Sequence, residues 1–174
     1  PGMPAEELLD MSDKWVLSEL ARTAAEVTAN LDKYELGLAA EKVENFIWDI
    51  YCDWYIEICK SRLNGEDAQQ ADTARKVPAW VLDKALKLLH PFMPFITEEI
   101  YQALPGSAET IMTQEWPDAG KMTAWPQECA DFEVLMDYIK AVRTIRNDMN
   151  VHPAKKTSMT IETANPAAFQ KGGA

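Results

Sequence analysis

The chain has 174 residues, of which 47% are hydrophobic, and this is the size of one ordinary domain with a single core. Its formal net charge of -11 argues against a protein that coats DNA or lies on a membrane surface, because both need a dominant basic face. The acidity is uneven, since residues 140–174 hold six basic and two acidic residues, a net charge of +4. A polyanion is therefore expected near the C-terminal end or at local basic spots.

Three cysteines, Cys52, Cys59 and Cys129, are expected to be free thiols. On one helix, Cys52 and Cys59 would lie two turns apart, with about 10 Å between their Cα atoms, which is too far for a disulfide. Free thiols fit the reducing cytoplasm. The chain has no close pairing of cysteine and histidine that would indicate a zinc site. It also has no apolar run near the roughly 18 residues that a membrane crossing requires.

The first part of the chain predicts two helices. Ser12 is a suitable N-cap and apolar residues then recur at helical spacing, which predicts a helix over residues 12–31. A longer helix is expected over residues 35–63, where two apolar stripes adjoin. Because a helix that is apolar on two faces is usually buried, other helices should pack around this one. Burial is therefore the explanation that we favour for its aromatic residues Trp48, Trp54 and Tyr55.

A loop and a third helix are expected next. Residues 64–72 are polar and contain a turn signal, so they predict a surface loop. The third helix should start near Asp72, pass Pro78 in an early turn, and end at Pro91, because proline cannot continue the hydrogen-bond ladder.

The segment after the third helix is more irregular. Thr97 is expected to cap a short helix that reaches residue 104. Residues 107–127 have no sustained period but are too apolar for a free linker, so they predict an ordered strap whose tryptophans fill gaps between helices. Residues 128–149 are again strongly helical.

The C-terminal residues predict a change of structure. Residues 155–163, KKTSMTIET, alternate in the manner of a strand, and a single strand cannot stand alone because its backbone groups need a partner. The expected fold is thus an all-α helical bundle over residues 1–150, with residues 151–174 as the truncated start of a small α/β subdomain.

Motifs for catalysis are missing from the sequence. There is no glycine-rich phosphate loop after a strand, no serine or cysteine nucleophile in a recognisable motif, and no paired-histidine spacing. Asp53 and Glu57 lie one turn apart, but such a pair on an exposed helix face is usually a solvated stripe. Neither catalysis nor a cofactor is therefore expected of this chain.

Basic residues stand near aromatic residues at two places. Lys14 precedes Trp15, and Arg75 and Lys76 precede Trp80. Such pairs can grip single-stranded RNA, because bases stack on aromatic rings while cations meet phosphates. A place in the core is the alternative for each tryptophan. On the last helix, Lys140, Arg143 and Arg146 follow each other at three-residue steps, either to bind a polyanion or to pair with acids.

Five strings in this order are similar to one known family. They are SDKWVLSEL (12–20), FIWDIYCDWYIEICK (46–60), LLHPFMPFITEEIY (88–101), IMTQEWP (111–117) and IRNDMNVHPAKK (145–156). Together they resemble the C-terminal anticodon-binding domain of bacterial valyl-tRNA synthetases. HPFMPF is shared loosely by the isoleucyl and leucyl relatives, whereas CDWYIE and the Glu-Trp-Pro strap indicate the valyl member.

The resemblance implies a helical bundle of the class I synthetase anticodon-binding type. It would belong to a large, monomeric, cytoplasmic ligase that joins valine to its tRNA with ATP, and its partners would be valine tRNA and the catalytic domain of the same polypeptide. The family's His-Ile-Gly-His-like and Lys-Met-Ser-Lys-Ser-like signatures are missing from this chain. No ATP site is therefore expected here, and no membrane partner.

The resemblance also implies a contact zone for the anticodon loop at the starts of the first and third helices. The residues at these positions are Lys14, Trp15, Arg75, Lys76, Trp80 and Val81. The basic edge of the last helix adds Arg143 and Arg146 as RNA-binding candidates.

Two alternatives remain at this point. One is the same domain from an isoleucyl or leucyl relative, and the other is a structural helical domain for protein interaction whose aromatic residues all lie in the core. Full burial of both Trp15 and Trp80, without basic neighbours, would favour the second alternative. Because the chain is acidic, we also expect it to bind tRNA weakly on its own at physiological salt.

Overall fold

The computed structural model describes residues 2–152, 154–156, 158, 160 and 162. It divides into two compact units, residues 1–125 and 126–174. The helices of the first unit are α1 (Met11–Asp32), α2 (Leu36–Asn45), α3 (Glu57–Leu63), α4 (Ala68–Leu89) and α5 (Pro94–Gln102). Helices dominate the described residues, and the predicted all-α fold is thereby confirmed.

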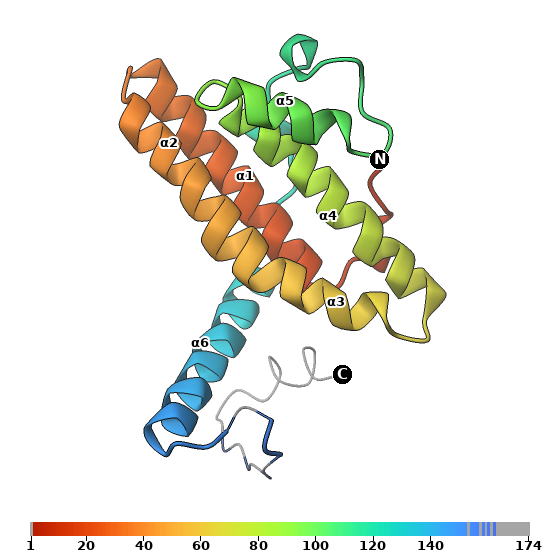
Figure 1. Ribbon diagram of the computed structural model, residues 1–174, viewed down its shortest axis with the longest axis vertical. Coiled ribbons are helices and arrows are strands. Elements are labelled where there is room, and N and C mark those ends of the chain that lie inside the picture. Colours follow the sequence, from red (N-terminus) through yellow and green to blue (C-terminus); the bar gives the residue numbers. More distant parts are fainter. Residues whose placement is uncertain (1, 153, 157, 159, 161, 163–174) are drawn as a thin grey trace. The chain divides into compact units, whose positions relative to one another are not determined.

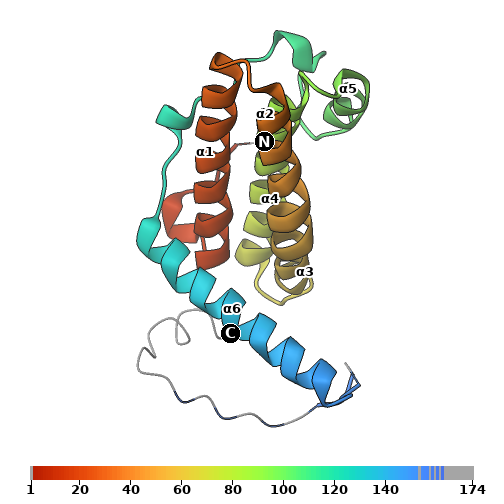
Figure 2. The ribbon, with the colours of Figure 1, turned by 90° about the vertical axis from the view of Figure 1, so that its left-hand side faces the viewer.

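The first unit is a helical bundle. α1, the run from α2 to α3, and α4 lie side by side in alternating directions (Figure 1, Figure 2). Short connections between long helices produce this antiparallel order. The shorter α5 follows α4 at the end of the bundle where α1 turns into α2 (Figure 1).

The start of α1 is fixed by two aspartates. Asp10 is the N-cap, and its Oδ1 accepts a hydrogen bond of 2.9 Å from the backbone N–H of Asp13. In return, Oδ2 of Asp13 accepts a bond of 3.1 Å from the backbone N–H of Asp10, which completes a capping box. The predicted N-cap, Ser12, was wrong, because Ser12 lies inside the helix and donates its hydroxyl to Asp10 Oδ1 at 2.7 Å.

The predicted helix over residues 35–63 is confirmed as a continuous helical run, but its centre is not α-helical. Phe46–Ile56, labelled η2, is an 11-residue π-helix between α2 and α3. Hydrogen bonds that span five residues widen the turn and change which side chains face the core. The residues of η2 that are buried are Phe46, Tyr51 and Tyr55.

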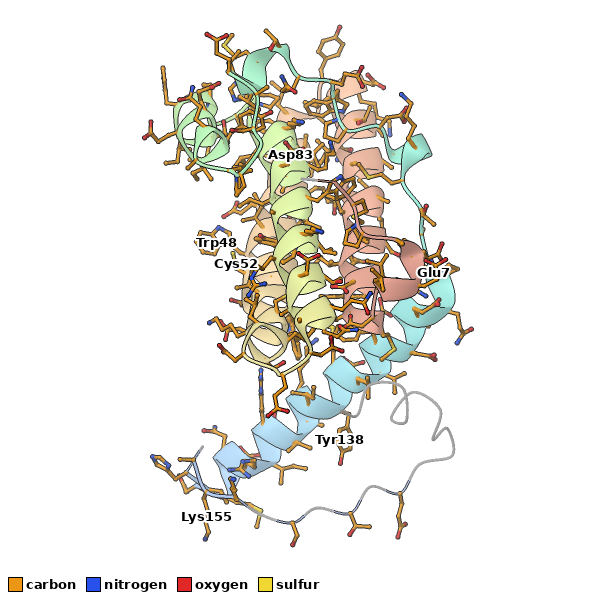
Figure 3. All side chains as sticks on the ribbon, turned by 90° about the vertical axis from the view of Figure 1, so that its right-hand side faces the viewer. Glu7, Trp48, Cys52, Asp83, Tyr138 and Lys155 are labelled. Carbon is orange, nitrogen blue, oxygen red and sulfur yellow. The ribbon has the colours of Figure 1, made fainter. Side chains whose placement is uncertain are left out.

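The predicted burial of Trp48 was wrong for this reason. Its side chain is 62% exposed, and Figure 3 shows it projecting from the bundle near Cys52. Trp54 is half-buried, whereas Tyr55 is buried as predicted. A buried face predicted from a period of 3.6 residues per turn is wrong where the helix has more residues per turn.

Helix α4 starts earlier than predicted. Oδ1 of Asp67 accepts hydrogen bonds from the backbone N–H groups of Gln69 at 2.9 Å and Gln70 at 3.1 Å, so the helix begins at Ala68 rather than near Asp72. Pro78 therefore lies mid-helix, and its carbonyl accepts a 3.1 Å bond from the Tyr51 hydroxyl.

Helix α5 also starts earlier than predicted. Pro94 occupies its first turn, a position that suits proline because the first N–H groups have no helical partner. The predicted cap Thr97 is instead buried inside the helix. Its hydroxyl donates to the Met93 carbonyl at 2.8 Å and lies 2.7 Å from Nδ1 of His90.

Residues 107–125 form the strap that the sequence predicts. It contains the short 3-10 turns η3 (Ile111–Thr113) and η4 (Ala119–Lys121). The indole Nε1 of Trp116 donates to Thr28 Oγ1 at 2.9 Å, and that of Trp125 donates to Glu6 Oε1 at 2.8 Å. Trp116 remains 37% exposed, so it holds the strap by its N–H group rather than by filling a gap.

The second unit contains α6 (Pro126–Asp148), which confirms the helix predicted over residues 128–149. Residues 157, 159, 161 and 163 of the strand predicted over residues 155–163 lie outside the described residues, so this strand stays a prediction. The boundary predicted between residues 150 and 151 stays a prediction. None of the helices formed by the described residues has the length and apolar character needed to cross a membrane.

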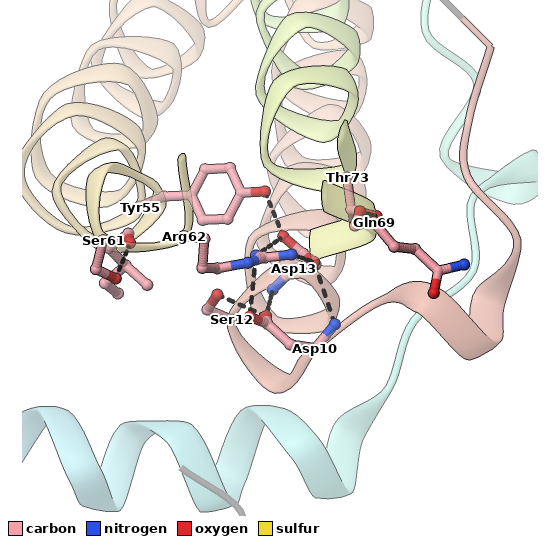
Figure 4. A network of polar contacts seen from close by, with 9 residues as sticks. Asp10, Ser12, Asp13, Tyr55, Ser61, Arg62, Gln69 and Thr73 are labelled. Atoms are coloured by element: carbon pink, nitrogen blue, oxygen red, sulfur yellow. Dashed lines mark hydrogen bonds and ion pairs between the residues drawn. The ribbon is translucent and has the colours of Figure 1, made fainter. Parts of the chain in front are cut away.

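A buried carboxylate joins three helical segments of the first unit (Figure 4). Asp13 is 0% exposed, and the guanidinium of Arg62 meets its two oxygens at 2.8 and 2.9 Å. The Tyr55 hydroxyl donates to the same carboxylate at 2.6 Å, and Asp10 lies 2.9 Å from Arg62. Burial lowers the pKa of Arg62, but its contacts with Asp13 outweigh this effect and raise it. The guanidinium of Arg62 therefore stays charged.

Replacing Arg62 should destabilise the bundle strongly. In Arg62→Met, the buried carboxyl group of Asp13 would lose its cationic partner, and such changes cost about 3–5 kcal/mol of unfolding free energy. Urea unfolding followed by circular dichroism measures the loss. The matched control is Lys60→Met, which removes an exposed pair with Glu57 and should cost less than about 1 kcal/mol. Equal effects of the two substitutions would contradict the account.

The two cysteines of the long helical run should differ in reactivity. Cys59 is 2% exposed, and burial raises the pKa of its thiol to about 11. Cys52 is only half-buried, although burial also raises its pKa. Because the thiolate is the reactive form, iodoacetamide near pH 8 should alkylate Cys52 first and Cys59 only on unfolding. Mass spectrometry of timed samples measures the order, and prompt labelling of Cys59 would show that this core opens readily.

Candidate nucleic-acid interface

Basic and aromatic residues share one face of α4. Lys76, Trp80 and Lys84 recur every four residues, which places them in one stripe. Trp80 is half-buried, and Nζ of Lys84 lies 5.3 Å from the centroid of its ring. A cation at this distance is attracted to the ring by about 0.5–1 kcal/mol at an exposed site. The stripe therefore presents an aromatic ring beside positive charge.

Two hollows meet at Trp80, between α4 and the strap. The first, here named the tryptophan cavity, has a volume of about 310 Å³, and its walls include Leu9, Leu17, Trp80, Lys121, Met122 and Trp125. The second, here named the strap cleft, has a volume of about 480 Å³, and its walls include Trp80, Lys84, Lys87, Trp116, Lys121 and Met122. Both are within the size range of small-molecule and nucleotide sites.

The charges of the strap cleft are nearly balanced. Asp83, which Figure 3 labels on α4, lies 3.1 Å from Lys84 and 3.0 Å from Lys87. Across the cleft, Lys121 faces Asp118 at 3.7 Å. Glu115 adds a further acid to the lining. The cleft can bind an anion only if a lysine exchanges its carboxylate partner for it.

The residues predicted from the first helix separate into two groups. Nζ of Lys14 lies 6.0 Å from the ring centroid of Trp125, and Trp125 lines the same cavity as Trp80. The structure thus brings Lys14 and Trp80 to one region. Trp15, by contrast, is only 3% exposed. A buried ring gives a base no face on which to stack.

The other predicted residues are also spread over different surroundings. Val81 is 0% exposed, so its side chain faces the core. Arg75 and Lys76 are exposed in the middle of α4, and Lys76 pairs with Asp72 at 2.6 Å. In the second unit, the described side chains of α6 include the two predicted arginines. Arg143 is exposed, and Nη2 of Arg146 donates to the backbone carbonyls of His152 at 3.1 Å and Lys155 at 2.9 Å, beyond the end of the helix.

Sequence reasoning missed the contribution of the strap. The two hollows are lined in part by Trp116, Lys121 and Trp125. The sequence of the strap had predicted only an ordered connection. A signal was present, because Lys121 lies between two tryptophans in the same way that Lys76 precedes Trp80. The same pattern, a basic residue near an aromatic residue, could therefore have been looked for in the strap as well.

The criterion that would favour a purely structural domain is not met. Trp15 is buried, but Trp80 is accessible and has Lys84 beside it. Among the described residues, no group of three or more His, Cys, Asp and Glu is placed to hold a metal ion. What the site offers is an aromatic ring, apolar walls and exchangeable cations.

Comparison with known proteins assigns this arrangement to a family. Residues 13–161 match the family model described as the anticodon-binding domain of tRNA ligase. The valine–tRNA ligase of Bacillus licheniformis is 44% identical over 98% of this chain and 20% of its own length. The enzymes of Staphylococcus epidermidis and Bacillus subtilis are 43% and 41% identical, over 89% and 94% of this chain and 18% and 19% of their own lengths.

The chain therefore spans about a fifth of the length of these curated relatives. The family match covers far more than half of the chain, including the whole of α2 to α5 and the strap. The family predicted from the five sequence strings is confirmed, and the chain belongs to the anticodon-binding domains of tRNA ligases.

Proposed function

We propose that this chain binds the anticodon stem-loop of valine tRNA as part of a valine–tRNA ligase. The supporting observation is the accessible ring of Trp80, with Lys84 beside it, between two hollows of the first unit. The similar proteins that are valine–tRNA ligases support the choice of amino acid. ATP and valine would be bound by the catalytic domain of the same polypeptide, in a monomeric cytoplasmic enzyme.

The proposed mechanism is recognition of a splayed loop. Unstacked bases lie on exposed aromatic rings, and each stacked base contributes about 1–3 kcal/mol. Trp80 supplies such a ring, while Lys14, Arg75 and Lys76 supply cations for phosphates around it. Phosphate contacts position the loop, and polar contacts with base edges discriminate between anticodons. Trp15 and Val81 would act from the core, by holding the helices that carry these contacts.

Binding of the isolated chain should be weak and salt-dependent. A net charge of -11 repels RNA, so we expect a Kd weaker than about 1 µM near 150 mM salt and tighter binding near 50 mM. Fluorescence anisotropy of a labelled valine anticodon stem-loop measures both values. Stem-loops of isoleucine and leucine tRNAs serve as competitors, and stronger binding of either would favour the corresponding relative. No binding at low salt would reject the proposed function.

Removal of the accessible ring should weaken binding selectively. Trp80→Ala is expected to raise the Kd for the valine stem-loop about 5- to 150-fold, which corresponds to the loss of one stacked base. Trp48→Ala is the matched control, because Trp48 is exposed on another side of the bundle (Figure 3) and should leave the Kd unchanged. Circular dichroism verifies that both variants fold. Similar losses in the two variants would remove Trp80 from the site.

A further inference from the structure

The tryptophan cavity and the strap cleft adjoin each other and differ in the chemistry of their walls. Trp80, Lys121 and Met122 line both of them, so the two spaces meet at these side chains. On one side, Leu9 and Leu17 give the tryptophan cavity apolar walls. On the other, the strap cleft is bordered by lysines of α4. Apolar walls suit the base of a nucleotide, and the neighbouring lysines suit its phosphate.

The walls are held in place without a ligand. The backbone N–H of Trp125 donates to Ser18 Oγ at 2.9 Å, and the indole of the same residue donates to Glu6. At the other end, Trp116 is bonded to Thr28. Three hydrogen bonds thus fix the strap against α1 and the N-terminal segment. Preorganised walls lower the ordering cost that binding would otherwise incur.

The lysines of the strap cleft can change partners. Lys84 and Lys87 share the single carboxylate of Asp83, so neither lysine has that carboxylate to itself. The pair of Lys121 and Asp118 is 3.7 Å long, with side chains 78% and 54% exposed. Such exposed pairs contribute only about 0–1 kcal/mol, so a phosphate can displace the carboxylate. Together with Asp118, Glu115 opposes the anion and keeps its binding weak.

We propose that α4 and the strap form a socket for one extruded nucleotide of the anticodon loop. Its base enters the tryptophan cavity against Trp80 and Met122, and its phosphate lies in the strap cleft between Lys84 and Lys121. This inference rests on the proposed function and adds to it the place of a single base. It also assigns a role to Lys121, and it makes Glu115 and Asp118 negative determinants of affinity.

A coupling experiment tests the place of the base. Stem-loops with an abasic site at each loop position in turn are titrated against the intact chain and against Trp80→Ala and Trp80→Phe. If one base occupies the cavity, one abasic position should weaken binding to the intact chain but have about fivefold less effect, or none, in Trp80→Ala. Trp80→Phe keeps a ring and should restore the sensitivity. Additive losses at every position would overturn the socket.

A charge experiment tests the place of the phosphate. Lys121→Ala should weaken binding at low salt and reduce the slope of log K against log salt by about 0.7, the value for one single-strand phosphate contact. Glu115→Gln and Asp118→Asn should tighten binding several-fold, an effect that no loss of packing would produce. The control is Lys60→Ala on the exposed part of α3.

The outcomes separate the two proposals. If the intact chain binds the stem-loop but Lys121→Ala, Glu115→Gln and Asp118→Asn all leave its affinity unchanged, the socket is rejected and the proposed function stands. If the intact chain does not bind the stem-loop at low salt, the proposed function fails and the socket fails with it. Because the side chain of Lys121 is 78% exposed, its variant tests binding without a risk to folding.

Discussion

The bundle depends on one buried carboxylate. Asp13 completes the capping box at the start of α1, accepts a hydrogen bond from the Tyr55 hydroxyl of the π-helix, and pairs with Arg62 near the end of α3. A buried charge is costly unless it has partners. These contacts therefore fix how α1 and the helical run from α2 to α3, which are far apart in the sequence, align with each other. The interaction is structural, but it also positions one residue of the candidate interface, because Lys14 follows Asp13 directly.

The π-helix extends this constraint to α4. Its Tyr51 hydroxyl reaches the carbonyl of Pro78, two residues before Trp80. The indoles of Trp116 and Trp125 hold the strap against α1 and the N-terminal segment, and the strap borders the same part of α4 at the strap cleft. Tryptophans in this unit therefore have three different uses: core packing, attachment of the strap, and an accessible ring. Composition alone treats them as equivalent, whereas the position of each N–H group and ring face separates them.

Helical periodicity predicted the order and type of the main elements, because apolar spacing is a local property of the chain. It failed where a longer-range or local polar interaction decided the outcome. Asp67 moved the start of α4, and the π-helix turned Trp48 to solvent. For the candidate site, the sequence predicted Trp80 and Lys14, and the structure brings these two residues to one region. The strap residue Lys121 escaped notice because its proximity to α4 is a tertiary property with no periodic signal.

The most direct test of the account is a map of the six tryptophan indole N–H signals of this 19.6 kDa chain by NMR during titration with the valine anticodon stem-loop. Recognition at the Trp80 surface predicts that the signals of Trp80, Trp116 and Trp125 shift together, while that of exposed Trp48 stays in place. Shifts confined to Trp48, with the other three unchanged, would contradict recognition at this surface.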